Sequence, residues 1–217
     1  MPIAGKGMLI TWMDVDPADE ADFNLWYDRE HLAERVAIEG FMEARRWIAV
    51  QAGAKYFNTY STQSFETLSS PAYKQVLANQ TAWSNKHISR FRNPGRVIGR
   101  ISHSRGQGRG GALGVVRLRP AADGRDAART GLLPLLDPGM LPGIVSLHLV
   151  ESDPELSRTL TDPDTANPGA ADWYVLIDGT DVGAVTQLVE SRFQAAGIPV
   201  VATGTYRLLW DLVKGEL

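Results

Sequence analysis

The chain of 217 residues contains no cysteine, and this absence removes a whole group of chemistries. Without thiols there is no disulfide, no zinc–thiolate site, no iron–sulfur cluster and no thiol nucleophile. Histidine is also scarce, with four residues along the whole sequence: His31, His87, His103 and His148. Because four separated histidines supply metal ligands poorly, we expect no metal site.

Long hydrophobic runs and an excess of one charge are missing as well. No apolar stretch approaches the roughly 18 residues that a membrane-spanning helix needs, and the N-terminal segment lacks the layout of a secretion signal. The formal net charge of -3 is not the basic balance typical of proteins that bind nucleic acid or acidic membranes. We therefore expect a cytoplasmic globular protein whose partner is a small-molecule ligand, with no nucleic-acid or membrane partner.

Residue patterns predict the order β-α-β-β-α-β twice along the chain. In the first set, strands are expected over 7–15, 41–50, 55–63 and 96–102, with helices ending at 38 and spanning 70–89. In the second set, strands are expected over 112–119, 143–151, 173–177 and 204–213, with helices over 124–136 and 182–196. This order is typical of the ferredoxin-like unit. We therefore predict an α+β fold of two tandem ferredoxin-like units, residues 1–103 and 112–217.

Between the two units, residues 104–111 are rich in glycine and arginine and have no apolar periodicity, which indicates a linker. A phosphate-binding loop is the alternative, but its glycines normally lie between a strand and a helix, whereas these precede a strand. In the second unit, the polar stretch 152–172 is long enough to be a lid or a disordered excursion.

Each ferredoxin-like unit leaves one sheet face uncovered, and packing the two sheets against each other is the simplest way to bury both. The predicted result is a pseudo-symmetric barrel-like body. Space between the two sheets would suit a small ligand, since such sites are concave and mostly apolar with a few polar groups.

The predicted first helix places carboxylates on an aromatic face. On a helical wheel, Trp26 and Tyr27 share a face with Glu30 and Glu34. A buried carboxylate is costly unless it is paired or protonated. This face therefore either lines a pocket or carries a structural salt bridge from Glu30 to Arg35, Arg45 or Arg46.

His31 lies at the edge of the same face, one turn after Tyr27 and three residues before Glu34. Histidine titrates closest to neutral pH, which suits a general base or acid, and its two neighbours would orient it or carry a second proton. The alternative is a solvated histidine on the helix surface.

A second apolar stripe, Leu25, Leu32 and Val36, is predicted on the opposite side of this helix. In a monomer this stripe would be exposed, because the helix is expected to bury only its other face. The stripe therefore favours a homo-oligomer.

Three further residues are predicted to complete the site. Arg45 and Arg46 follow the helix on a strand and would neutralise an anionic oxygen of a substrate. His148 occupies the strand position in the second unit that Arg45 occupies in the first, and it alternates with apolar neighbours. It therefore faces either the cavity between the sheets or solvent.

The run WYDREHLAER at residues 26–35, followed by Gly40-Phe41 and Arg45-Arg46, resembles the first-helix signature of EthD-like proteins in the dimeric α/β barrel superfamily. The resemblance covers residues 7–101, and the second unit resembles the fold alone. It implies a pair of ferredoxin-like sheets forming a barrel, with a pocket between sheet and helices. It also implies that His31 matches a position where such proteins keep a pocket histidine. Relatives include muconolactone isomerases, cofactor-free quinol monooxygenases, polyketide cyclases and haem-containing chlorite dismutases.

These observations together predict a cofactor-independent enzyme of the isomerase, cyclase or monooxygenase type that acts on a small aromatic or lactone-like metabolite. The predicted catalytic residues are His31, Tyr27 and Glu30, and the predicted substrate-binding residues are Trp26, Glu34, Arg45, Arg46 and His148. A non-catalytic small-molecule-binding or stress-related barrel is the first alternative. A haem-binding barrel is the second, although the sequence has no proximal haem-ligand motif.

Overall fold

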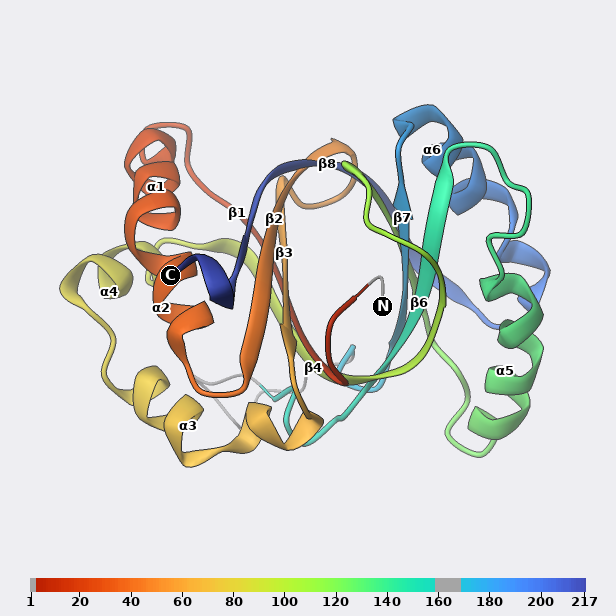
Figure 1. Ribbon diagram of the computed structural model, residues 1–217, viewed down its shortest axis with the longest axis horizontal. Helices are drawn as coiled ribbons and strands as arrows, with labels where there is room; N and C mark the ends of the chain where they lie inside the picture. Colours follow the sequence, from red (N-terminus) through yellow and green to blue (C-terminus); the bar gives the residue numbers. More distant parts are fainter. Residues whose placement is uncertain (1–2, 159–168) are drawn as a thin grey trace.

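The computed structural model describes residues 3–158 and 169–217, which form an α+β fold around a closed antiparallel β-barrel (Figure 1). Its strands are β1 (Gly7–Asp14), β2 (Phe41–Gln51), β3 (Tyr56–Thr62), β4 (Arg92–Gly106), β5 (Ala112–Leu118), β6 (Ile144–Ser152), β7 (Trp173–Gly179) and β8 (Val200–Val213). Around the barrel they follow the order β1-β3-β2-β8-β5-β7-β6-β4, and β4 pairs with β1 to close it.

Both halves of the chain use the same strand order, β4-β1-β3-β2 in the first and β8-β5-β7-β6 in the second. The halves join edge to edge, because β2 pairs with β8 and β4 pairs with β6. The sequence predicted two sheets packed face to face. The inner faces do oppose each other, but the edge strands are also hydrogen-bonded, so the barrel formed by the described residues has no unpaired strand edge.

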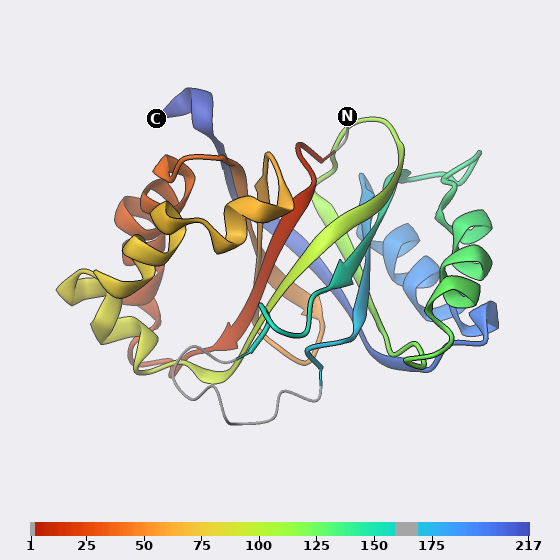
Figure 2. The same cartoon turned by 90° about the horizontal axis from the view of Figure 1, so that it is seen from below.

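Helices cover the outside of the barrel at its two ends along the long axis, as Figures 1 and 2 both show. The helices on the first half are α1 (Glu20–Trp26), α2 (Leu32–Ala37), α3 (Pro71–Ala78) and α4 (Ala82–Ile88). The helices on the second half are α5 (Arg125–Leu132) and α6 (Val182–Ser191). The chain ends beside α2, where the Lys214 ammonium donates to the carbonyl of Ile38 at 2.8 Å. No helix within the described residues is long and apolar enough to cross a membrane.

Buried side chains form three separate cores. The first helix layer lies between the first four helices and the barrel and includes Phe23, Trp26, Tyr27, Leu32, Val36 and Tyr60. The barrel interior includes Met8, Ile10, Trp47, Phe57, Tyr174 and Tyr206. The second helix layer includes Leu118, Leu132, Trp173, Val185 and Phe193. Because side chains alternate along a strand, neighbours on one strand belong to different cores.

Two predicted elements differ from those in the structure. Strand β4 continues to Gly106, so its pairing with β6 takes up the first residues of the predicted linker 104–111. The helix predicted over 70–89 is broken between α3 and α4, where the Thr81 hydroxyl accepts from the backbone N–H of Ser84 at 2.9 Å and begins α4. The predicted polar loop 152–172 lies in part, at residues 159–168, outside the described residues.

Candidate functional site

The first helix changes its winding at a π-helical turn, Tyr27–His31, between α1 and α2. Such a turn takes an extra residue and is frequent at functional sites. A regular wheel puts Leu32 and Val36 opposite Trp26, yet both are fully buried in the first helix layer. The predicted second apolar stripe is therefore wrong. Of its three members only Leu25 is exposed, at 49%, so the stripe no longer argues for a homo-oligomer.

The π-helical turn places His31 against two aromatic rings. Its ring centroid lies 4.2 Å from that of Trp26 and 5.0 Å from that of Tyr27. The His31 residue is 8% exposed, and no hydrogen-bond partner reaches its Nδ1 atom from the described part of the chain. The alternative that the sequence left open, a solvated histidine on the helix surface, is therefore wrong.

Burial, and then the positive charges of Arg35 and Arg46, hold the pKa of His31 well below its ordinary value. The imidazole is consequently neutral at neutral pH and able to accept a proton. Burial raises the pKa of Tyr27 and of Tyr60, whose hydroxyls hydrogen-bond to each other. Both phenols therefore stay protonated and act as neutral hydrogen-bonding groups.

Arg46 lies under the same helix, on the outer face of β2. Its guanidinium carbon is 4.3 Å from the centroid of the Tyr27 ring. The Nη2 atom donates to Asn24 Oδ1 at 2.6 Å and Nη1 to Asp28 Oδ1 at 3.2 Å. Its Nε atom is buried and has no acceptor among the described residues.

Arg35 is the second buried cation of this layer, with 4% of the residue exposed. Its Nη2 atom donates to Gln80 Oε1 at 2.8 Å, but its buried Nη1 atom finds no acceptor in residues 3–158 and 169–217. Buried donors without acceptors are costly. An anionic or carbonyl oxygen bound in this layer would give Arg35 Nη1 and Arg46 Nε the acceptor that they lack among the described residues.

Glu30 is directed away from His31, toward α4. Its Oε1 atom accepts from the Thr81 hydroxyl at 2.6 Å, from Trp26 Nε1 at 3.2 Å and from the Ser84 hydroxyl at 3.4 Å. The salt bridge to an arginine that the sequence left open is absent among the described residues. Glu30 therefore connects the first helix to α4 and fixes the Trp26 ring.

Glu34 is half-buried on α2. Burial, followed by the negative charge of Glu30, raises the pKa of its carboxyl. A raised pKa suits a group that carries a proton.

The two remaining predicted residues lie in a different core. Arg45 and His148 face the barrel interior, where both meet Asp178 of β7. Arg45 Nη1 donates to Asp178 Oδ1 at 2.6 Å, and its Nη2 donates to the carbonyl of Gly110 at 2.6 Å. His148 Nε2 lies 3.6 Å from Asp178 Oδ2, and its Nδ1 is 2.6 Å from the Ser104 hydroxyl.

The eight predicted site residues thus divide between two cores. Arg45 and Arg46 are neighbours on β2 and point to opposite faces of the sheet, as alternation requires. The helix residues gather with Arg46, whereas Arg45 and His148 lie across the sheet from them. A single site containing all eight, as the sequence predicted, is therefore not formed.

Two residues of the first helix layer were not among the predicted site residues. The sequence offered Arg35 only as a salt-bridge partner, because a regular wheel places it away from Trp26 and the π-helical turn brings it back. Tyr60 was not singled out, although the alternation of Tyr56, Asn58 and Tyr60 along β3 is a signal of one polar, aromatic strand face.

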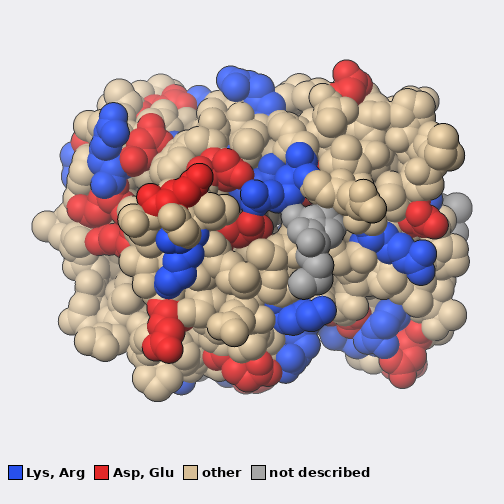
Figure 3. Space-filling view, in the orientation of Figure 1, with Lys and Arg blue, Asp and Glu red and all other residues tan. Residues whose placement is uncertain are grey.

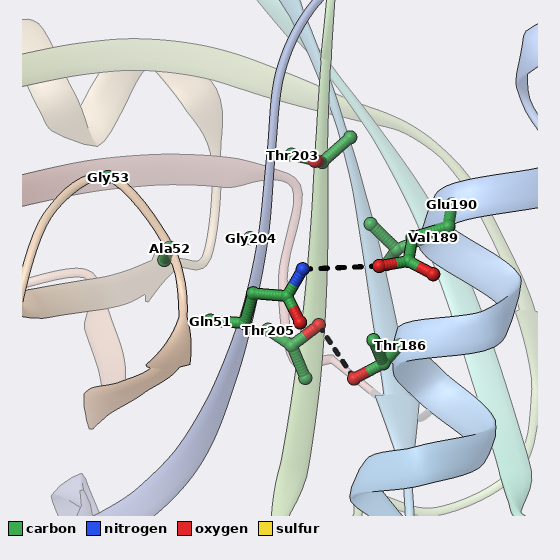
Figure 4. Close-up of a pocket in the computed structure, with 9 residues that line it drawn as sticks. All are labelled: Gln51, Ala52, Gly53, Thr186, Val189, Glu190, Thr203, Gly204 and Thr205. Atoms are coloured by element: carbon green, nitrogen blue, oxygen red, sulfur yellow. Dashed lines mark hydrogen bonds between the residues drawn. The ribbon is translucent and has the colours of Figure 1, made fainter.

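The molecular surface offers other features outside this layer. Lys and Arg side chains are interspersed with Asp and Glu on the described part of the face in Figure 3. A pocket of about 270 Å³ lies between the β2–β3 turn, β8 and α6 (Figure 4). Gln51 Nε2 donates to Glu190 Oε1 there at 3.1 Å, and the hydroxyls of Thr186 and Thr205 are 3.1 Å apart. None of the predicted site residues lines this pocket.

Comparison with solved structures identifies the fold. An anthrone oxidase-like protein is 14% identical, with a TM-score of 0.69 over 99% of this chain and 95% of that one. A proposed monooxygenase from Fusobacterium nucleatum is 9% identical, with a TM-score of 0.60 over 99% and 97%. A chlorite dismutase from Candidatus Nitrospira defluvii is 12% identical, with a TM-score of 0.54 over 95% and 92%. No family model and no curated protein matches the sequence. The chain therefore shares the barrel fold of these proteins, and at these identities the likeness shows the fold alone.

Proposed function

We propose that this protein is a cofactor-independent enzyme that acts on a small aromatic or lactone-like metabolite by general acid/base chemistry. The observation that carries the proposal is the buried, neutral imidazole of His31 beside guanidinium groups with unused donors. Similarity to proteins described as anthrone oxidase-like and as monooxygenases supports the same class of chemistry.

The proposed architecture is two ferredoxin-like units, residues 1–103 and 112–217, each supplying four strands in the same order. Of these, the first unit carries the site. The second unit has no counterpart of the aromatic and charged helix, so we expect one site per chain. Assembly of two or more such barrels stays a prediction, which light scattering on the purified protein tests.

The proposed first step is proton transfer from an acidic C–H or O–H of the substrate to the imidazole of His31. The electron pair of the broken bond stays on the substrate as an enolate or phenolate. The donors of Arg35 and Arg46 bind the resulting oxygen, and their charge stabilises the anion as it forms. This anion also offsets the repulsion between the guanidinium groups and the new imidazolium.

The same anion is the precursor of three reactions. Return of the proton to a different carbon is an isomerisation, attack on an electrophilic carbon within the molecule is a cyclisation, and reaction with O2 as the oxidant is an oxygenation. Tyr27 orients the imidazole or the substrate through its hydroxyl, and Glu34 is the second proton carrier. Glu30 acts through Trp26 as a positioning residue, which changes the catalytic role predicted for it.

The test begins with a thermal-shift screen of anthrones, hydroquinones and unsaturated lactones. Turnover of the best ligand is then followed by absorbance and by O2 uptake. His31→Asn should lower kcat about 100-fold or more, as expected for loss of a general base. Arg46→Met should raise KM and lower kcat together, because an interaction with the developing anion is lost. His103→Asn serves as the matched control and should leave both constants unchanged.

Full turnover by the His31→Asn variant would show that His31 is not catalytic. Ligands that stabilise the fold without being converted would instead favour the non-catalytic binding barrel.

A haem-binding barrel fits the residues less well. On the second half, neither α5 nor α6 carries a histidine, cysteine, methionine or tyrosine, the side chains that ligate haem iron. Soret absorption of protein expressed with a haem supply would overturn this conclusion.

A further inference from the structure

A second pocket, of about 170 Å³, opens at the end of the barrel where Trp12 and the β2–β3 turn lie. The rings of Trp12, Phe57, Tyr174 and Tyr206 line it together with Arg117. We propose that this pocket is a binding site for a single-ring aromatic carboxylate. It goes beyond the proposed function, because these side chains belong to the barrel interior and not to the first helix layer.

Glycines on two strands make room for the aromatic walls. A Cβ atom on Gly95 would lie 1.9 Å from the Trp12 ring, and one on Gly204 would lie 2.8 Å from the Tyr206 ring. Both rings can therefore lie directly against a strand backbone. Phe57 and Tyr206 face each other with centroids 5.1 Å apart. The pocket volume is close to that of an engineered cavity of about 150 Å³ that binds benzene, so it accepts one ring.

Tyr174 supplies a polar group without a use in the fold. The residue is 2% exposed, and its buried hydroxyl has no hydrogen-bond partner within the described residues. Burial raises the pKa of this phenol, so it remains a donor. Leaving a hydroxyl buried and unpaired costs free energy. A ligand oxygen in the pocket would remove that cost.

Arg117 makes the pocket suitable for an anion. Its guanidinium carbon lies 5.9 Å from the centroid of the Tyr174 ring and 5.7 Å from that of Trp12. Arg117 Nε and Arg119 Nε each donate to a different oxygen of the buried Asp172, at 2.6 Å. Within the described residues these two cations share one carboxylate, which leaves one positive charge beside the pocket.

A negative charge, that of Asp14, lies at the other side of the pocket, where burial and then this charge raise the pKa of Tyr206. Its oxygens already accept from the backbone N–H of Lys55 at 2.7 Å and from Asn93 Nδ2 at 3.1 Å. The carboxylate of a ligand is therefore expected at the Tyr174 and Arg117 side, with its ring between the aromatic walls.

The two sites are on opposite faces of the same sheet. Phe57 lines the barrel pocket, whereas the preceding residue, Tyr56, faces the first helix layer. Indole resonances distinguish the two sites, since Trp12 belongs to the pocket and Trp26 contacts His31.

The test uses benzoate as the probe, titrated into 15N-labelled protein while the indole N–H resonances are recorded. Trp12→Phe and Trp26→Phe variants assign the two signals. For a ligand of this size we expect a Kd of about 1 mM, with a shift of Trp12 and none of Trp26. Cyclohexanecarboxylate and benzyl alcohol, which lack the aromatic ring and the charge respectively, should bind more weakly.

Arg117→Lys and Arg119→Lys form a matched pair, because both arginines bind Asp172 and only Arg117 lines the pocket. Arg117→Lys should weaken benzoate binding about tenfold and Tyr174→Phe about fivefold. Arg119→Lys should leave it unchanged, and so should His31→Asn. A shift of Trp26 in place of Trp12, equal losses in the two lysine variants, or loss of binding in His31→Asn would each overturn the proposal.

Discussion

The ion pair between Arg45 and Asp178 tests whether Arg45 is part of the fold or part of the substrate site. Their side chains are 5% and 1% exposed, and their charged atoms lie 2.6 Å apart. Arg45 belongs to β2 and Asp178 to β7, so the pair links the two halves across the barrel interior. Asp178→Asn removes the charge and nearly preserves the volume.

The expected loss follows from this burial. Removing one partner of a buried ion pair costs about 3–5 kcal/mol, because the other charge is left uncompensated. Arg45 would keep the Gly110 carbonyl at 2.6 Å and gain an amide oxygen, so we expect the lower end, about 3 kcal/mol. In a protein of this size 1 kcal/mol corresponds to about 2–4 °C in Tm. The variant should therefore melt about 6–12 °C below the parent protein.

Differential scanning calorimetry measures this difference, with urea unfolding as a second measurement. Glu155→Gln is the control, because its partner Arg158 forms an exposed pair at 2.8 Å and surface pairs contribute little. The double variant Arg45→Met, Asp178→Leu should recover much of the loss, since two well-packed apolar groups replace the pair. A Tm of Asp178→Asn less than about 2 °C below that of the parent protein would refute the reasoning. The effective dielectric constant around the ion pair would then be higher than the burial of the two side chains implies.

Two further predictions follow from individual residues. Burial and two guanidinium groups hold the pKa of His31 well below its ordinary 6.5. Below pH 6.5, His31 therefore takes up a proton in the unfolded chain but stays neutral in the folded chain. Stability should therefore fall as pH drops below 6.5, by up to about 1.4 kcal/mol per pH unit. In urea titrations across this range His31→Asn should reduce the slope, and His87 and His103, whose pKa values burial also lowers, should account for part of the remainder. An unchanged slope would contradict a neutral His31. Gly95→Ala, whose Cβ would lie 1.9 Å from the Trp12 ring, should destabilise the fold by about 1–3 kcal/mol. Gly53→Ala, with nothing within 4 Å, should leave Tm unchanged, and equal melting of the two variants would show that the Trp12 ring moves freely.

Local sequence signals predicted the elements of this barrel well. Alternation and turn residues placed strands at positions that the structure confirms, such as β2 and β3 around the turn at Gly53. Strand β4 was predicted too short, because its later part is rich in glycine and arginine and becomes a strand only by pairing with β6. Pairing between segments far apart in sequence is invisible to local propensity.

The candidate site was predictable only in part. The sequence identified His31, Tyr27 and Trp26 as neighbours, and the structure places their rings in contact. It assigned Arg45 to the same site, because no local sequence pattern reveals that Asp178 lies across the barrel interior and pairs with Arg45. The sequence also did not place Arg35 in the site, because a helical wheel drawn with regular α-helical spacing does not account for a π-helical turn.

The sequence by itself determined the chemistry available to this protein: no thiols, four histidines, and one helix that combines aromatic, imidazole and carboxylate groups. It also determined the order of strands and helices, since that order depends on local periodicity and turns. Only the tertiary structure decided which groups meet. The closure of the barrel and the π-helical turn direct Arg46 and Arg35 toward His31 and send Arg45 to Asp178. Those directions depend on strand pairing and helix winding over the whole fold, which is why no single stretch of sequence encodes them.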